Sequence, residues 1–368
     1  MKNGGDILKK IKKLLIISAV IYLCIEFIFC ERVKLNVIDA FKICTFSLLP
    51  SLFPLMIMSN FISITDLKFI FSQIFGLISE KIFHCPKTYA HILFMSLIGG
   101  YPVGAIMINS ALENDEITVS DAEKLICFCV NCSPAFIING VGQGILNNTK
   151  AGVVIWISEL ISTILIGNCM KINVKGNMIK NKACKFSYIE GLSESINKSV
   201  FSILNIFGYV IGFSAFSAVL SDNILFKKVI DLCYCKFLNN ILPYDYFKTF
   251  IYSMIEISGG IFKIHNAKIE YISLFAFLTS FGGLGVIFQI KNSFKQKINL
   301  KLFIISRFAM GIYSVMITEI IKRFFWKKTV LTIAISNKEA YINSNNVIYT
   351  LCMLSMIITI LLKREEIE

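Results

Sequence analysis

Two stretches of the sequence place a helix-start signal inside otherwise apolar segments. In Asn131-Cys132-Ser133-Pro134, the serine is a favoured N-cap residue and the proline a favoured first helical residue. The stretch Gly99-Gly100-Tyr101-Pro102-Val103-Gly104 has the same character, and its glycines permit close approach of a ligand. The free N–H groups at a helix start carry a partial positive charge. Both stretches therefore predict a site for a carboxylate or a phosphate.

Two further breaks lie in the second half of the chain, at Ser258-Gly259-Gly260 and at Ser280-Phe281-Gly282-Gly283. Non-helical backbone survives in hydrocarbon only where it is buried in protein or lines a cavity. The structural alternative is a proline kink with small-residue helix packing, because several glycine pairs, such as Gly208 and Gly212, are four residues apart. Four breaks at matched positions favour a binding or permeation site.

Ionisable groups within apolar runs are also candidate functional residues. Glu256 lies two residues before one of the breaks, and Arg307 is the only arginine deep in an apolar run. We expect Arg307 to pair either with an anionic substrate or with a membrane glutamate. Glu26, Glu159 and Glu319 are solitary, and each is either a proton-coupling acid or a hydrogen-bonded glutamate facing the bundle.

Four amides in the apolar segments either line a polar path or bridge helices: Asn109, Asn139, Gln143 and Gln289. The acidic loop at 113–123 ends in a Ser-x-x-Glu pattern at 120–123, which predicts a capping box that starts the next helix.

The composition places these residues in a membrane protein. The chain has 368 residues, of which 55% are hydrophobic and 17% charged, and its mean hydropathy is +0.69. Soluble globular proteins have about 45–50% apolar and about 25% charged residues. A transmembrane helix needs roughly 20 mostly apolar residues, and the sequence has about 10–12 hydrophobic segments. We therefore predict an all-α polytopic membrane protein.

The apolar segments form two similar groups between a first span at 14–30 and a last span at 347–362. The first group lies at 45–62, 67–83, 89–112, 125–146 and 151–169, and the second at 199–220, 224–242, 250–266, 269–290 and 302–320. The four breaks fall at matching positions in the two groups. Repeats with discontinuous helices in corresponding positions are typical of secondary transporters.

Basic residues orient these segments. Lysines at 9–13 precede the first span without a small-residue cleavage site after it, so we predict an uncleaved span and a cytoplasmic N-terminus. If all five segments of the first group cross, the basic stretch at 171–185 lies inside and the second group is inverted. The basic residues at 291–301 then also lie inside, whereas those at 322–328 fall outside. Segments 67–83 and 224–242 are short and half-polar, so they either cross, lie at the interface or form half of a re-entrant hairpin.

Other classes are disfavoured. The net charge of +13 comes from short lysine blocks between apolar runs, which does not indicate a nucleic-acid partner. The 12 cysteines and 3 histidines have no metal-ligand spacing, and there is no phosphate-binding glycine loop. No nucleophile–base pair is recognisable, so we predict neither an enzyme nor a bound metal or cofactor.

The stretches at 49–54, 100–105, 128–137 and 280–286, with weaker matches at 256–260 and 306–311, together span roughly residues 45–311. In order and spacing they resemble the sporulation integral membrane proteins of the YlbJ type, which belong with nucleoside-recognition or gate domains related to concentrative nucleoside transporters. The sequence departs from that pattern at Ile287, where the family carries a serine and often a histidine.

The resemblance implies an endospore-forming bacterium and transport of dipicolinate across the outer forespore membrane, which the mother cell supplies. An ion-coupled nucleoside transporter and a non-transporting component of spore-envelope assembly are the alternatives. The expected partners are the lipid bilayer, the solute and a coupling ion, and oligomerisation is left open. The substrate-binding residues that we predict are Gly99, Gly100, Tyr101, Pro102, Gly104, Asn131, Ser133, Pro134, Glu256, Ser258, Gly259, Gly260, Ser280, Gly282, Gly283, Gln289 and Arg307.

The expected organisation has five parts. Residues 1–44 hold the basic N-terminus, the first transmembrane helix and a connection, and 45–169 form the first gate-like repeat. Residues 170–198 form a basic cytoplasmic loop, 199–320 the second repeat, and 321–368 a surface segment and the last transmembrane helix.

Overall fold

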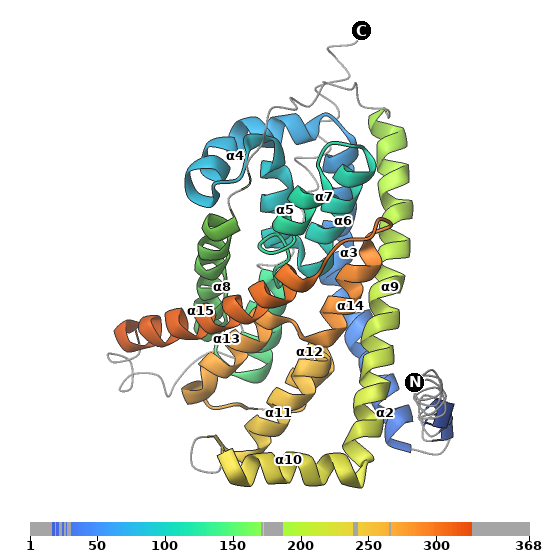
Figure 1. Ribbon diagram of the computed structural model, residues 1–368, viewed down its shortest axis with the longest axis vertical. Helices are drawn as coiled ribbons and strands as arrows, with labels where there is room; N and C mark the ends of the chain where they lie inside the picture. The colour runs from blue at the N-terminus through green and yellow to red at the C-terminus, as the bar shows by residue number, and fades with distance from the viewer. Residues whose placement is uncertain are drawn as a thin grey trace, which may run out of the picture.

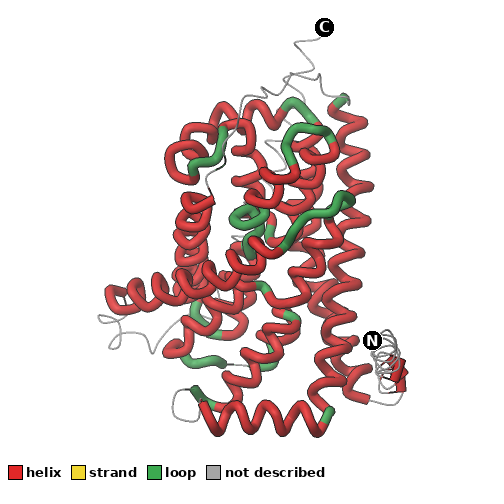
Figure 2. The backbone as a smooth tube through the Cα atoms, in the orientation of Figure 1, coloured by secondary structure: helices red, strands yellow, loops and turns green. Residues whose placement is uncertain are grey.

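The computed structural model describes residues 31–170, 172, 187–237, 242–264 and 266–325, and a few residues between 17 and 27. These residues form helices joined by short loops, with no strand among them (Figure 2). Five of the described helices are long and apolar enough to cross a membrane: Glu31–Ile64, Thr149–Met170, Tyr188–Asp222, Ile269–Ser293 and Lys301–Phe324. The chain is therefore an all-α polytopic membrane protein, as its composition predicts. The expected last span at 347–362 and most of the first lie outside the described residues.

The first half begins with one long helix made of α2 (Glu31–Ile43), a π-helical turn η1 (Cys44–Leu48) and α3 (Leu49–Ile64). The predicted boundary at residue 45 therefore falls inside a helix. The remaining elements of this half are α4 (Leu67–Phe83), η2 (Lys87–Tyr89), α5 (Ala90–Gly99), α6 (Tyr101–Glu113), α7 (Val119–Leu125), the π-helical η3 (Phe136–Ile145) and α8 (Thr149–Met170).

The second half begins with α9 (Tyr188–Asp222), so this helix starts inside the loop expected at 170–198. It continues with α10 (Ile224–Phe237), α11 (Tyr244–Ile255), α12 (Ile257–Ile261), η4 (Ile269–Tyr271), α13 (Ile272–Phe281), α14 (Gly283–Ser293) and α15 (Lys301–Phe325). Corresponding helices of the two halves pack together: α3 lies along α9, and α15 crosses α8 (Figure 1).

The two short, half-polar segments lie across the ends of the bundle. Figure 1 shows α4 at one end of the long axis and α10 at the other, each across that axis. Neither is among the five candidate spans. Of the alternatives for these segments, the structure thus favours surface helices. Their positions at opposite ends agree with an inverted arrangement of the two halves.

The segments at 89–112 and 250–266 are broken as predicted, but they fold back as hairpins, and the expectation that they cross is wrong. In the first hairpin Gly100 has a φ of 86° between α5 and α6. A Cβ on Gly104 would lie 2.9 Å from the Cβ of Ser96 on the opposite arm. In the second hairpin, a Cβ on Gly260 would lie 2.6 Å from the Oγ of Ser253. Each hairpin therefore places a glycine against a serine, which lets its arms touch.

The break in the second hairpin lies earlier than predicted. Ser258, Gly259 and Gly260 are helical residues of α12, and the extended residue is Glu256, with φ −144° and ψ 116°. A polar side chain at this position satisfies the N–H groups of the following helix start, which explains why the break falls there.

The segment at 125–146 is non-helical from 126 to 133, in the interior of the bundle. Helix resumes at Pro134, where Ser133 is the N-cap as predicted and its Oγ accepts the N–H of Phe136 at 3.2 Å. Upstream, the helix α7 is capped by Thr118, whose side chain accepts the N–H of Asp121. The capping box expected at 120–123 is therefore wrong by two residues.

Candidate functional site

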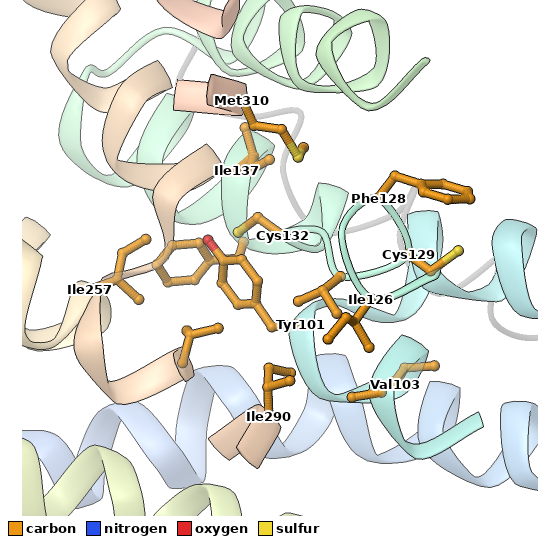
Figure 3. Close-up of a cluster of buried hydrophobic side chains, with 14 of the residues drawn as sticks. Tyr101, Val103, Ile126, Phe128, Cys129, Cys132, Ile137, Ile257, Ile290 and Met310 are labelled. Atoms are coloured by element: carbon orange, nitrogen blue, oxygen red, sulfur yellow. The ribbon is translucent and has the colours of Figure 1, made fainter. Parts of the chain in front are cut away.

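Both hairpin tips, the non-helical segment at 130–133 and α14 meet at a buried cavity of about 40 Å³. Figure 3 shows Tyr101, Cys132 and Ile257, which come from three of these elements, gathered in one region of the core. Seven predicted residues line the cavity: Gly100, Tyr101, Pro102, Ser133, Glu256, Ser258 and Gln289. Its apolar wall comes from Leu48, Leu52, Phe136, Ile206, Val210, Ile257 and Val286. A volume of this size holds a few water molecules.

A polar cleft of about 270 Å³ adjoins the cavity, and the two share Pro102, Ile206 and Gln289 as lining residues. Most of the cleft's other lining residues carry amides, hydroxyls or charges: Asn60, Asn109, Ser110, Glu113, Lys198, Ser202, Asn205, Asn292, Ser293 and Lys295. The cleft and the cavity therefore share part of their walls, and Asn109 and Gln289 line the cleft.

At one end of this cleft, a charged contact joins α6 to the loop before α15. The carboxylate of Glu113 accepts hydrogen bonds from Asn109 Nδ2 at 2.8 Å and pairs with Lys295 Nζ at 3.1 Å. Burial raises the pKa of Glu113, but the hydrogen bonds from Asn109 and Lys295 outweigh it and hold the pKa below its ordinary value. The carboxylate is thus ionised at neutral pH.

Glu256 occupies the helix start that the sequence offers to an anion. Its side chain is buried, and its Oε1 and Oε2 accept the N–H groups of Ser258 at 2.9 Å and Gly259 at 2.5 Å. Both donors at the start of α12 are therefore satisfied by the protein's own carboxylate. A solute carboxylate can use them only when the Glu256 side chain moves away.

The non-helical segment at 126–133 is held by side chains from neighbouring helices. Glu159 Oε1 accepts the N–H of Cys132 at 2.7 Å, from α8. Asn131 donates to the carbonyl of Phe128 at 2.8 Å and accepts from Thr163 Oγ1 at 2.9 Å. Because buried backbone groups need partners, Glu159 and Asn131 have a structural role at this break.

Arg307 binds the carbonyl side of the same segment. Its guanidinium is fully buried and donates to the carbonyls of Val130 and of Cys127, the latter at 2.6 Å, with Ser280 O at 3.5 Å. Arg307 does not line the cavity, and no described glutamate lies within ion-pair distance of it. In this structure the cation stabilises buried carbonyls at two helix breaks, and its pairing with a solute stays a prediction.

Ten of the predicted residues do not line the cavity: Gly99, Gly104, Asn131, Pro134, Gly259, Gly260, Ser280, Gly282, Gly283 and Arg307. Gly104 and Gly283 allow close backbone approach. A Cβ on Gly104 would overlap the carbonyl oxygen of Cys129, and one on Gly283 would lie 2.7 Å from the carbonyl oxygen of Ser253. Gly282, with φ 85°, faces the ring of Tyr101.

Sequence reasoning missed polar residues of the cleft, including Asn60 and Asn205. Both interrupt apolar runs as Asn109 does, so the same signal was present in the sequence. Asn60 lies on α3 and donates to Ser199 Oγ of α9 at 2.9 Å. Glu319 bonds Ser273 and Lys322, away from the cavity, and Glu26 lies outside the described residues.

The fold and its buried cavity define a polytopic α-helical integral membrane protein with discontinuous helices. The sequence is similar to the sporulation integral membrane protein YlbJ of Bacillus subtilis (strain 168), with 22% identity over 302 residues. The similar region covers 72% of this chain and 71% of that protein. No protein-family model matches the chain, and no solved structure matches it. The similarity supports the resemblance to the YlbJ type, while the nucleoside-recognition domain stays a prediction.

Proposed function

We propose that the protein is a sporulation transporter that moves a small anion, dipicolinate, across the outer forespore membrane. The observation that carries the proposal is the meeting of two hairpin tips, the non-helical segment at 126–133 and α14 at one buried cavity. Such breaks are costly in a membrane unless they line a path or a site, and transporters place substrate at discontinuous helices. The similarity to a sporulation integral membrane protein supports the cellular role.

The mechanism follows from the size and lining of the cavity. At about 40 Å³ it is too small for a pyridine dicarboxylate, so a binding state requires the hairpin tips to separate. In that state a solute carboxylate replaces the Glu256 carboxylate at the N–H groups of Ser258 and Gly259. Ser133 and Gln289 supply further hydrogen-bond donors in the same cavity. The displaced Glu256 takes up a proton or a cation, which couples its movement to that of the solute.

A second candidate is an ion-coupled nucleoside carrier. Among the described residues that line the cavity, Glu256 is the one acidic residue, and none is lysine, arginine or histidine. An uncharged, hydrogen-bonding solute therefore needs the cavity to enlarge but does not need to replace the Glu256 carboxylate. A non-transporting assembly role is the remaining alternative, and it predicts that variants of Glu256, Arg307 or Ser133 keep their function while loop deletions lose it.

The test is uptake of radiolabelled dipicolinate into proteoliposomes by the wild type, Ser133→Ala, Gln289→Ala and the control Gly208→Ala. Gly208 has no atom within 4 Å of an added Cβ, so its variant should transport normally. We expect both cavity variants to lose at least about tenfold in uptake, since each removes hydrogen bonds to a charged group. Nucleoside uptake without dipicolinate uptake would favour the second candidate.

Spores provide the cellular readout. A deletion strain complemented with the wild type should restore dipicolinate content, and Ser133→Ala should not, at equal membrane levels of protein. Normal dipicolinate content in the deletion strain would contradict the transport proposal. So would the absence of uptake of both solutes by correctly folded protein.

A further inference from the structure

A second, larger chamber lies between α10, α11 and the loop after α12, at the α10 end of the bundle. Its volume is about 740 Å³, and its wall is polar and aromatic. It shares no lining residue with the 40 Å³ cavity. The chamber is therefore a separate feature of the fold.

The described lining of this chamber carries more positive than negative charge. Its cations are Arg32, Lys227, Lys248, Lys263 and Lys268, and its carboxylates are Asp231 and Asp245. Arg32 and Lys227 both pair with Asp222, which lies beside the chamber. The other three lysines form no ion pair within the described part of the chain.

Aromatic rings hold two of these lysines in place. The ammonium of Lys263 lies 3.7 Å from the centre of the Tyr252 ring and 3.5 Å from Ser217 Oγ. The ammonium of Lys248 lies 5.3 Å from the centre of the Tyr244 ring. Cation–π contacts orient an ammonium while leaving N–H donors for another acceptor. The ammonium groups of Lys248 and Lys263 can therefore bind one guest, and Lys268 also lines the chamber.

One chamber carboxylate is already engaged. Tyr244 donates to Asp231 at 2.5 Å, and this hydrogen bond raises the pKa of Tyr244 to about 12. Lys263 lies in the loop after α12, outside the five candidate spans, and burial with the charge of Lys248 lowers its pKa to about 8, against the opposing charge of Glu256. A bound anion would relieve the repulsion between the two lysines.

We propose that this chamber binds a small oxyanion, a carboxylate or a phosphate, through Lys248, Lys263 and Lys268. Two sources offer that chemistry, a free solute and the headgroup of an anionic lipid. The adjacent helix α10 exposes apolar side chains at Leu225 and Leu232, so a lipid phosphate can reach the same lysines. The site does not depend on transport through the 40 Å³ cavity.

The test is calorimetric titration of the purified full-length protein in an uncharged detergent at low salt, where exposed charges are least screened. The probes are inorganic phosphate, dipicolinate and short-chain phosphatidylglycerol, with phosphatidylcholine as the neutral lipid. The variants are Lys263→Gln with Lys268→Gln, the charge-conserving pair Lys263→Arg with Lys268→Arg, and the control Lys87→Gln. Lys87 pairs with Glu80 and lines neither chamber nor cavity.

We expect at least one anionic probe to bind, with affinity reduced about tenfold or more in the glutamine pair. The arginine pair and Lys87→Gln should bind like the wild type, which shows that the glutamine effect is local. Binding of phosphate or dipicolinate identifies a solute site, and binding of phosphatidylglycerol alone a lipid site. Absence of binding by all anionic probes, or equal affinity of the glutamine pair and the wild type, overturns the proposal. Dipicolinate uptake without chamber binding would overturn this site and leave the proposed function standing.

Discussion

Replacing Gly104 with alanine tests how the first hairpin meets the non-helical segment at 126–133. A Cβ on Gly104 would overlap the carbonyl oxygen of Cys129 and lie 2.8 Å from its carbonyl carbon and 2.9 Å from the Cβ of Ser96. Ordinary carbon contacts are about 3.5–4.0 Å. The arm of the hairpin must therefore retreat from both neighbours by the better part of an ångström or more.

Relief of this overlap is difficult because the facing segment is fixed. Arg307 binds the carbonyl of Cys127 and Glu159 binds the N–H of Cys132, on either side of Cys129. Overpacking a well-packed core costs about 1–3 kcal/mol, and the helix propensity of alanine returns up to about 1 kcal/mol. The overlap involves backbone, so we expect the upper end of that range and a net loss of about 2 kcal/mol. With an unfolding entropy of about 2.1 cal/mol/K per residue, that loss lowers the Tm of this 368-residue chain by about 2–3 °C.

The assay is thermal unfolding of the purified protein in detergent, followed by intrinsic fluorescence, with Gly208→Ala as the matched control. The added methyl group of Gly208→Ala meets open space, so its Tm should equal or exceed that of the wild type. If Gly104→Ala unfolds at the wild-type temperature and keeps its uptake activity, the hairpin does not touch the segment as described.

Arg307→Lys keeps the charge but loses the planar fork that reaches several carbonyls, so we expect about 1.5–3 kcal/mol of lost stability by thermal unfolding. The exposed Arg323→Lys on the same helix should change nothing, and equal Tm values for both would refute that role. Oxyanion binding in the chamber should weaken as pH rises through about 8, because Lys263 is protonated below that pKa; titrations at pH 6.5 and 9 with equal affinity would contradict this. The depressed pKa of Glu113 means that its pairing with Lys295 stabilises the fold above the unfolded pKa and is lost as pH falls through the folded value. Melting curves of the wild type and Glu113→Gln should therefore converge at acid pH.

Much of the cavity was predictable because its chemistry is local in sequence. Gly100 with a positive φ, and Ser133 before Pro134 as an N-cap, follow from residue type alone. The break at 282–283, where both glycines have a positive φ, also follows from residue type alone. These short patterns can be recognised without knowledge of the neighbouring helices, since they indicate backbone conformations that few other residues adopt.

The errors concern partners that are distant in sequence. Apolar length predicts a crossing at 89–112, but whether a broken segment crosses or returns depends on the contact between Gly104 and Ser96. The hydrogen bond from Arg307 to the carbonyl of Cys127 joins residues 180 positions apart in sequence. Spacing along one helix does not reveal which neighbouring backbone has lost its own hydrogen bonds.

The buried charges therefore limit how this protein can move. Arg307 and Glu159 hold the two sides of the segment at 126–133, so that segment and α8 and α15 form a unit that resists separation. Glu256 instead accepts the N–H groups of Ser258 and Gly259 in its own hairpin, and it faces the cavity. A cavity of about 40 Å³ can enlarge at least cost where few interhelical hydrogen bonds break. We therefore expect displacement of the second hairpin, with Glu256 at its tip, to open the site.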